Sequence, residues 1–547
     1  MPTESGRTNG RATEWWREAT VYQIYPRSFQ DASGDGVGDL PGIERRLDHL
    51  VDLGIDAVWI SPFYPSPMKD FGYDVSDYTG VDPLFGTMDD FDRLLGAVHA
   101  RGLKLILDFV PNHSSSEHPW FTESASSRDS AKRDWYIWRD PAPDGGAPNN
   151  WRSSSGGSAW EWHAGTEQYY LHKFLPSQPD LNWRNRAVRE AMLDAMRFWL
   201  ERGVDGFRLD VVYHCIKDAA FRDDPANPDY DPDTDPPFGA VRPVHSTNQH
   251  PEIMELVVNP MRKLADEFGA LLIGEIYLDH PELVRYYGDR PETGVQLPFN
   301  FSLVFADFTA EGLATLVRNY EALIPEWGWP NWVLGNHDQS RVATRLGPER
   351  ARLAAMLLLT LRGTPTIYYG DEIGMLDVDI PPDRVRDPWE INMPDLGEGR
   401  DPCRTPMRWT GEANRGFCPP DVEPWLPIGP MESNVAEQGE RENSALAHHR
   451  RLLALRREHP ALSRGRYEHV GHEGDVLIVE RVDGARADGA QAAGRVVVAM
   501  NFGKREAAVP ERARAKGLRT LHSTHDDPID ATDPLRPLEG RIMVIRS

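Results

Sequence analysis

Residues 103–113 read LKLILDFVPNH, an apolar run that ends in the polar pair Asn112 and His113. A short continuous apolar run is typical of a strand that is buried on both faces, as in a parallel sheet. Before it, apolar residues recur every three or four positions between 91 and 98, and Gly102 follows where a helix is expected to stop. The stretch therefore predicts a helix and then a buried parallel strand whose polar residues lie at its carboxyl end.

The same alternation continues over residues 20–375, where short β-branched runs are separated by amphipathic stretches. Strands are expected at Val21–Tyr25, Ala57–Ser61, Leu103–Val110, Gly206–Val212, Leu271–Tyr277, Val295–Asn300, Trp332–His337 and Pro365–Gly370. Eight strand–helix units are the number that closes a (β/α)8 TIM barrel, an α/β fold. An open doubly wound sheet is the competing interpretation, and we favour the barrel.

Two long interruptions and a change of pattern divide the chain further. Residues 112–183, rich in Trp, Ser and Gly, are too long for a loop after the third strand and predict a small inserted domain. Residues 222–251 form a second long loop, rich in Asp and Pro, which either covers an entrance or lies in solvent. Later short strands predict a C-terminal all-β sandwich. The expected division is the barrel over 1–111 and 184–461, an inserted domain over 112–183 and the β-sandwich over 462–547.

Composition excludes several classes of partner. The 547 residues carry 60 Lys and Arg against 85 Asp and Glu, a formal net charge of −25. Nucleic acids and anionic membranes are disfavoured as partners, because both are bound by clustered basic residues. The longest apolar run, Ala354–Leu361, is too short to span a bilayer, and three cysteines without CxxC spacing suggest neither disulfides nor a zinc site. We therefore expect a cytoplasmic protein that binds a small molecule.

Polar residues gather at the ends of four of the expected strands. These segments are Asp108–His113, Arg208–Asp210, Gly274–Glu275 and Asn336–Asp338. An acidic residue at one strand end often only caps the next helix, but the carboxyl ends of barrel strands share one rim, so four together predict an acidic pocket. Paired carboxylates without a phosphate-binding loop suit glycosidic bond cleavage, and the many Trp and Tyr residues suit stacking on sugars.

These segments resemble motifs of the α-amylase superfamily, and within it the oligo-1,6-glucosidase branch of exo-acting α-glucosidases. The resemblance runs from about Trp15 to the C-terminus. It rests on DFVPNH at 108–113, QPDLN at 178–182, GFRLD at 206–210, NHD at 336–338 and GTPTIYYGDEIGM at 363–375. The resemblance implies a retaining exo-α-glucosidase that removes terminal glucose from short α-glucosides, with some transglucosylation.

The resemblance also implies the catalytic roles. Asp210 would be the nucleophile that forms a glucosyl-enzyme intermediate, and Glu275 the general acid and then the base. Asp338 would stabilise the oxocarbenium-like transition state. Arg208 would pair with Asp210 and keep it ionised. In a retaining enzyme the nucleophile and the acid lie roughly 5 Å apart.

Five further residues would bind the sugar by the same resemblance. His113 and His337 would hydrogen-bond hydroxyls of the glucose that is cleaved, and Tyr73 would stack beneath it. Asp70 and Arg404 would pair across the floor of the pocket and read the non-reducing end. That pair would block the pocket and make the enzyme exo-acting.

The loop at residues 31–39 reads DASGDGVGD, with oxygen-bearing side chains at alternating positions. Such donors with intervening glycines suit a hard cation, although a solvated Asp/Gly turn is an equal alternative. Members of the branch bind a structural Ca²⁺ or Mg²⁺ in this loop. The ligands implied here are Asp31, Ser33, Asp35, the Val37 carbonyl and Asp39. No organic cofactor is expected.

Two positions bear on specificity, and several activities stay open. In this branch Val after the nucleophile, here Val211, goes with tolerance of α-1,6 linkages. Ser155 stands where Phe is usual, so an aromatic wall beside the cleaved sugar is expected to be lost. The alternatives are an oligo-1,6-glucosidase or dextran glucosidase, and a sucrose-directed hydrolase or transglucosidase. A non-catalytic partner protein, like the heavy chains of amino-acid transporters, is disfavoured because all three catalytic acids are present.

Overall fold

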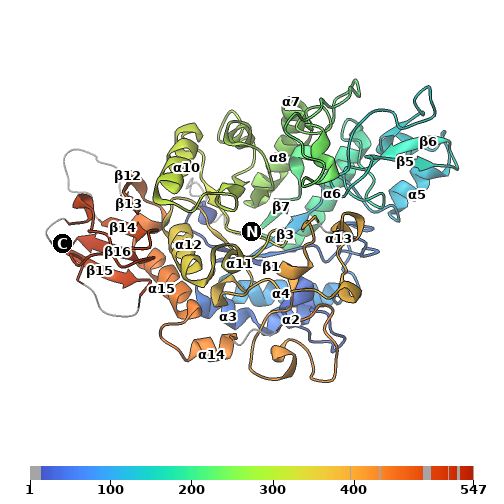
Figure 1. Ribbon diagram of the computed structural model, residues 1–547. Helices are drawn as coiled ribbons and strands as arrows, with labels where there is room; N and C mark the ends of the chain where they lie inside the picture. Colours follow the sequence, from blue (N-terminus) through green and yellow to red (C-terminus); the bar gives the residue numbers. More distant parts are fainter. Residues whose placement is uncertain are drawn as a thin grey trace, which may run out of the picture.

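A computed structural model describes residues 14–394, 396–429, 433–483, 494–514, 517–525 and 530–545. The predicted domain limits at 1 and 547 lie outside these residues. Figure 1 shows a central barrel, with a small domain that contains β5, β6 and α5 at one side. An antiparallel sheet that contains β12 to β16 lies at the opposite side.

The barrel is an eight-stranded parallel sheet in the order β10-β9-β8-β7-β3-β2-β1-β11. Its strands are β1 Val21–Ile24, β2 Ala57–Ile60, β3 Lys104–Phe109, β7 Gly206–Leu209, β8 Leu271–Gly274, β9 Leu297–Asn300, β10 Asn331–Trp332 and β11 Thr366–Tyr368. A parallel bridge between Val333 and Thr366 joins the two edges. Seven strands lie within their predicted ranges but are shorter, whereas β10 begins one residue early and shares only Trp332 with the predicted range. The closed sheet confirms the barrel over the open alternative.

Helices surround the barrel and begin and end where local signals predict. Thr87 and Asp90 form a capping box at the start of α4, and Gly203 ends α6 in a left-handed conformation. The α-helices outside the inserted segment are α1 Pro26–Phe29, α2 Leu40–Arg45, α3 Leu47–Leu53, α4 Met88–Ala100, α6 Arg186–Arg202, α7 His250–Ile253, α8 Asn259–Phe268, α9 His280–Leu283, α10 Ala310–Leu323, α11 Val342–Leu346, α12 Pro348–Thr360, α13 Pro388–Asn392, α14 Val435–Gly439, α15 Ala445–Glu458 and α16 Pro460–Ser463.

Residues 112–183 contain α5 Pro119–Ser126 and a small antiparallel sheet in the order β4-β6-β5. Its strands are β4 Trp138–Arg139, β5 Trp160–His163 and β6 Gln168–Leu171. The long loop 222–251 is tied to this segment, since Trp151 Nε1 donates to the Arg222 carbonyl at 2.8 Å and Lys173 Nζ contacts Ser246 Oγ at 3.2 Å. The two long interruptions of the barrel therefore form one continuous wall.

The C-terminal strands form one five-stranded antiparallel sheet in the order β12-β13-β14-β16-β15. They are β12 Arg466–Glu473, β13 Val476–Val482, β14 Arg495–Asn501, β15 Leu518–Ser523 and β16 Gly540–Ile545. Helix α10 contacts β12 and β13, which holds the sheet against the barrel. Within the described ranges, no helix combines the length and the apolarity needed to cross a membrane.

Candidate active site

A cavity of about 1020 Å³ opens at the carboxyl ends of the barrel strands. Seven of the nine residues that the sequence assigns to catalysis and sugar binding line it: Asp70, Tyr73, His113, Asp210, Glu275, His337 and Asp338. The other two, Arg208 and Arg404, are buried behind this lining, at 0% and 1% exposure. The strand ends therefore deliver the predicted side chains to one place, as a barrel rim requires.

Arg208 joins the two carboxylates at the centre of the cavity. Its Nη1 contacts Asp210 Oδ1 at 2.7 Å, and its Nη2 contacts Glu275 Oε2 at 2.7 Å. Nη1 also contacts Asp108 Oδ1 at 2.8 Å. Because the two terminal nitrogens of one guanidinium contact Asp210 and Glu275, the two carboxyls lie close together.

The chain turns sharply directly after Asp210. Val211 has a φ of 34°, in the left-handed region that a β-branched residue rarely adopts. The turn directs the Val211 N–H to Glu275 Oε2, which it contacts at 2.9 Å. Backbone conformations of this kind cost about 1–3 kcal/mol and concentrate at functional sites. Here the strained turn places a donor on the second carboxylate.

The pKa values of the two central carboxyls, Asp210 and Glu275, are raised. Burial raises the pKa of Asp210, and the charges of Glu275 and Asp108 raise it further against the opposing effect of Arg208. Burial also raises the pKa of Glu275. Two buried carboxyls that repel each other lose their protons in separate steps, so an intermediate state carries one proton between them. That state supplies one ionised carboxylate and one carboxylic acid.

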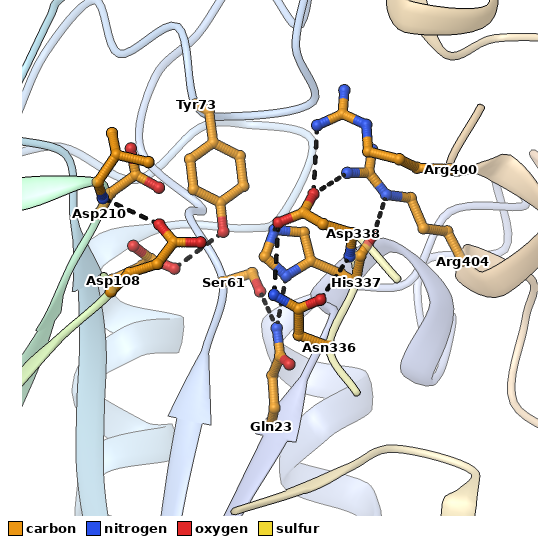
Figure 2. A network of polar contacts seen from close by, with 12 residues as sticks. Gln23, Ser61, Tyr73, Asp108, Asp210, Asn336, His337, Asp338, Arg400 and Arg404 are labelled. Atoms are coloured by element: carbon orange, nitrogen blue, oxygen red, sulfur yellow. Dashed lines mark hydrogen bonds and ion pairs between the residues drawn. The ribbon is translucent and has the colours of Figure 1, made fainter. Parts of the chain in front are cut away.

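Asp338 lies in a different electrostatic environment. Its Oδ1 contacts Arg400 Nη1 at 3.2 Å and Arg404 Nη2 at 2.9 Å, as Figure 2 shows. Burial alone would raise the pKa of Asp338, but His337 and the two arginines outweigh burial and lower it. Asp338 therefore stays ionised at a pH at which the pair Asp210 and Glu275 still holds a proton.

The predicted pairing of Asp70 with Arg404 is wrong. Asp70 Oδ1 instead contacts Arg400 Nη2 at 2.8 Å. Arg400 is anchored by Asp387, which accepts from its Nε at 3.0 Å and its Nη2 at 2.7 Å, so the guanidinium reaches Asp70. Arg404 is occupied elsewhere, because its Nε donates to the His337 carbonyl at 2.7 Å and its Nη2 reaches Asp338.

The two predicted sugar-binding histidines are buried in similar ways. An amide nitrogen faces Nδ1 of each, from Asn112 at 3.0 Å for His113 and from Gln23 at 2.7 Å for His337. Burial lowers the pKa of His113 to about 4 and that of His337 well below its usual value. Both imidazoles are therefore neutral at physiological pH.

Tyr73 packs its ring on His337, with centroids 5.2 Å apart and planes 4° from parallel. Its hydroxyl donates to Asp108 Oδ2 at 3.0 Å, which fixes the ring beside the cavity (Figure 2). Asp108 also accepts from Trp59 Nε1 at 3.2 Å. The ring thus lines the cavity beside His337, and its role as a platform for a sugar stays a prediction.

Aromatic residues from three separate segments line the rest of the cavity. Phe174 comes from the inserted segment, Phe238 from the loop 222–251 and Trp389 from α13. The rings of Phe238 and Trp389 lie 6.4 Å apart, so the long loop contributes to the pocket and is not only a surface excursion. Ser155 is buried, and it is its neighbour Ser154 that lines the cavity.

Carboxylates of the loop 31–39 accept hydrogen bonds from backbone N–H groups of the same loop. Asp31 Oδ1 accepts from the Gly34 N–H at 2.6 Å, and Asp39 Oδ2 accepts from the Ser33 N–H at 2.8 Å. Asp35 is exposed, and its carboxylate accepts from the Val37 N–H at 2.9 Å. The described residues contain no group of three or more His, Cys, Asp or Glu side chains arranged for a metal. The oxygens suit a hard cation in type, and the metal site stays a prediction.

Sequence reasoning missed several residues that position the site. Arg400 precedes the predicted Arg404 by one turn, and only its place in the run Gly399–Asp401 marks it. Asp108 was noted as part of a motif without a role, although it joins Arg208 and Tyr73. Gln23 is a polar residue in the middle of a buried apolar strand, and that contrast is a usable signal.

Residues 23–465 match the model of the family described as alpha amylase, catalytic domain. The chain belongs to the α-amylase family. A probable alpha-glucosidase of Rhizobium meliloti (strain 1021) is 44% identical over 483 residues, which cover 85% of this chain and 86% of that protein. An oligo-1,6-glucosidase of Heyndrickxia coagulans is 39% identical over 496 residues, which cover 83% of this chain and 87% of that protein.

Solved structures of this family have the same fold. The crystal structure of an alpha-glucosyl transfer enzyme, XgtA, superposes with a TM-score of 0.88 at 40% identity, covering 97% of this chain and 99% of that chain. A variant of the trehalulose synthase MutB superposes with a TM-score of 0.86 at 33% identity, covering 97% of this chain and 100% of that chain. The architecture is thus shared along nearly the whole length.

Proposed function

We propose that this member of the α-amylase family is a retaining exo-α-glucosidase acting on short α-glucosides. The observation that carries the proposal is the pair Asp210 and Glu275, held by the two terminal nitrogens of Arg208 inside one cavity. Retaining glycosidases need two carboxyls about 5–5.5 Å apart, close enough for direct attack on the sugar. The relatives named alpha-glucosidase and oligo-1,6-glucosidase support the same class of reaction.

In the first step, the Asp210 carboxylate attacks the anomeric carbon while Glu275 protonates the departing glycosidic oxygen. The glycosidic bond breaks, and a covalent glucosyl ester with Asp210 forms. In the second step, the Glu275 carboxylate takes a proton from water, whose oxygen attacks the same carbon and releases Asp210. Asp338, which stays ionised, stabilises in this mechanism the positive charge that develops on the sugar ring. Two displacements return the original α configuration.

The exo character is supported by the pairs that line one side of the cavity. Asp70 and Arg400 are joined at 2.8 Å, and both are at most 8% exposed. Gln178 Nε2 donates to Asp70 Oδ2 at 3.0 Å, which fixes the carboxylate from the other side. A buried, hydrogen-bonding pair of this kind suits the hydroxyls of a terminal sugar, which supports action at a chain end.

Transfer of glucose to another sugar or alcohol is the second candidate. The aromatic rings of Phe174, Phe238 and Trp389 supply a surface on which an acceptor other than water can stack. The superposed structures described as an alpha-glucosyl transfer enzyme and as a trehalulose synthase support this possibility. The oligo-1,6-glucosidase, dextran glucosidase and sucrose-directed activities belong to the same reaction class and remain the alternatives for the linkage.

The purified protein is expected to release p-nitrophenolate from p-nitrophenyl α-glucoside and glucose from maltose, isomaltose or sucrose. Comparing kcat/KM for these sugars ranks the linkages, and chromatography of the products at high substrate concentration detects transfer. Proton NMR of the first product should show α-glucose before mutarotation. Inactivity on every α-glucoside, or an initial β product, would contradict the proposal.

We further propose that the loop 31–39 binds Ca²⁺ as a structural ion. Three carboxylates within nine residues, Asp31, Asp35 and Asp39, support it, because each keeps lone pairs beyond those used by the N–H groups. The melting temperature is expected to rise by several degrees with millimolar CaCl₂ over EDTA. Asp35→Ala should remove that rise and leave kcat/KM unchanged. An identical melting temperature in both buffers would refute the site.

We propose that the protein acts on a small α-glucoside and does so in the cytoplasm. The cysteines Cys215, Cys403 and Cys418 are free and buried, which fits a reducing compartment. A purely structural partner role is disfavoured, because a protein without catalysis has no use for buried acids such as Asp210 and Glu275 whose charges cost stability.

A further inference from the structure

Gln23 lies in the middle of β1 and is fully buried. Its side-chain nitrogen contacts His337 Nδ1 at 2.7 Å and Ser61 Oγ at 3.2 Å, whereas its oxygen Oε1 has no hydrogen-bond partner. Figure 2 shows the amide directly behind the imidazole, on the side away from Arg400. A buried glutamine that points at an active-site histidine needs a reason, because an unpaired amide oxygen is costly.

The ring of His337 is held between two aromatic rings. The centroid of Tyr73 lies 5.2 Å from it and that of Tyr25 5.6 Å, with planes 4° and 17° from parallel. This stack fixes the plane of the imidazole but does not decide which nitrogen carries the proton. That choice depends on the hydrogen-bonding groups at the two ring nitrogens.

The groups that face Nδ1 and Nε2 of His337 favour the same tautomer. An amide N–H at Nδ1 requires an acceptor there, and Asp338 Oδ2, at 3.4 Å from Nε2, requires a donor on the other nitrogen. The reversed amide would place Oε1 against Nδ1–H, and Nε2 would then present a lone pair to the Asp338 carboxylate. The arrangement with Nε2–H is therefore the one in which neither contact is repulsive.

We infer that Gln23 is a positioning residue that locks His337 in the Nε2–H tautomer, so that the imidazole faces Asp338 and the cavity only as a donor. The inference rests on the proposed glucosidase function, in which His337 donates to a sugar hydroxyl. Among the described residues, Gln23 is not part of the cavity lining. It therefore acts through His337 on how the sugar and Asp338 are held.

A doubly protonated ring would satisfy both ends only with the Gln23 amide reversed, and the surrounding charges oppose that state. Arg404 and Arg400 approach from the segment 400–404 and Arg208 from β7, and Asp338 alone among the main charged neighbours favours the imidazolium. Burial is the largest effect and lowers the pKa of His337. The neutral ring therefore needs a group such as Gln23 to select its tautomer.

The test is the pH profile of Gln23→Glu, which keeps the shape of the side chain and replaces the donor by an acceptor. The new carboxylate draws the His337 proton to Nδ1 and leaves Nε2 as a lone pair facing Asp338. We expect kcat/KM at pH 7 to fall about 5- to 100-fold, the cost of a mispaired buried group. The loss should shrink as the pH is lowered, because a second proton on His337, or one on Glu at position 23, restores Nε2–H.

Two comparisons separate this role from a merely structural one. Gln23→Met should lower kcat/KM without moving the pH optimum, since it removes the donor and adds no charge. Gln30→Glu is the matched control, because Gln30 is also a buried amide but donates to backbone carbonyls such as that of Phe417. An equal loss at every pH in Gln23→Glu, or no loss, would overturn the inference.

A second measurement does not depend on the Gln23 variants folding. Imidazole ¹⁵N spectra of the wild-type protein, assigned by difference with His337→Gln, should show a neutral ring protonated at Nε2 at pH 7. A ring protonated at Nδ1 would overturn the inference even in a fully active enzyme. A wild-type protein inactive on all α-glucosides would instead remove the proposed function and leave the tautomer as a separate finding.

Discussion

Asp210→Asn is expected to lower kcat/KM by at least about 10⁴-fold on every substrate that the wild-type protein cleaves. Asparagine has the same shape, so Arg208 keeps its contacts with Asp108 and Glu275 and the fold is retained. The amide cannot form a glucosyl ester, and covalent catalysis is lost as a whole. The measurement is p-nitrophenolate release, with the melting temperature as evidence of folding.

The matched control is Asp379→Asn, because Asp379 also lines the cavity but is exposed and lies outside the proposed catalytic set. It should change kcat/KM less than about threefold. The wild-type protein treated with 5-fluoro-α-glucosyl fluoride should gain one fluoroglucosyl group, and peptide mapping should place it on Asp210. A label on another residue, or a loss below a hundredfold in Asp210→Asn, would assign the nucleophile elsewhere.

The barrel was predictable because its strands are short apolar runs bounded by glycines and polar residues. The closing bridge between Val333 and Thr366 was not predictable in itself, and it follows from the number of strands. The central acids were predictable for a related reason. Asp210 and Glu275 directly follow the strands β7 and β8, so the fold alone decides where they lie.

The pairing of side chains that lie outside regular elements was not predictable. Arg400 immediately precedes a 3-10 turn that ends at Arg404, and both side chains reach the same rim. Which of them meets Asp70 depends on Asp387, whose carboxylate fixes Arg400 by two contacts. Such choices are set by distant residues that converge in three dimensions, and spacing along the chain carries no information about them.

Glu275→Gln is expected to have the second-largest effect, and one that depends on the leaving group. Glutamine cannot supply the proton that a sugar leaving group needs, so kcat/KM for maltose should fall about 10³- to 10⁴-fold. p-Nitrophenolate leaves without a proton, so the first step on the aryl glucoside should be much less affected. The second step still lacks its base, and a burst of p-nitrophenolate followed by slow turnover should result.

The pH profile of the same variant provides an independent check. Because burial raises the pKa of Glu275, the wild-type carboxyl stays protonated to a higher pH than an exposed glutamate, and kcat/KM falls on the alkaline side as it ionises. That alkaline fall should vanish in Glu275→Gln. Azide, which attacks without base catalysis, should restore turnover and yield the α-glucosyl azide.

Glu398→Gln is the control for the loss of a carboxylate, because Glu398 lines the same cavity outside the proposed catalytic set. It should keep the alkaline fall and show no burst. If Glu275→Gln lost activity equally on maltose and on the aryl glucoside, with no response to azide, Glu275 would be an electrostatic support and not the acid. In that case Asp338 is excluded as its replacement, because the lowered pKa that His337, Arg400 and Arg404 impose leaves it without a proton to give.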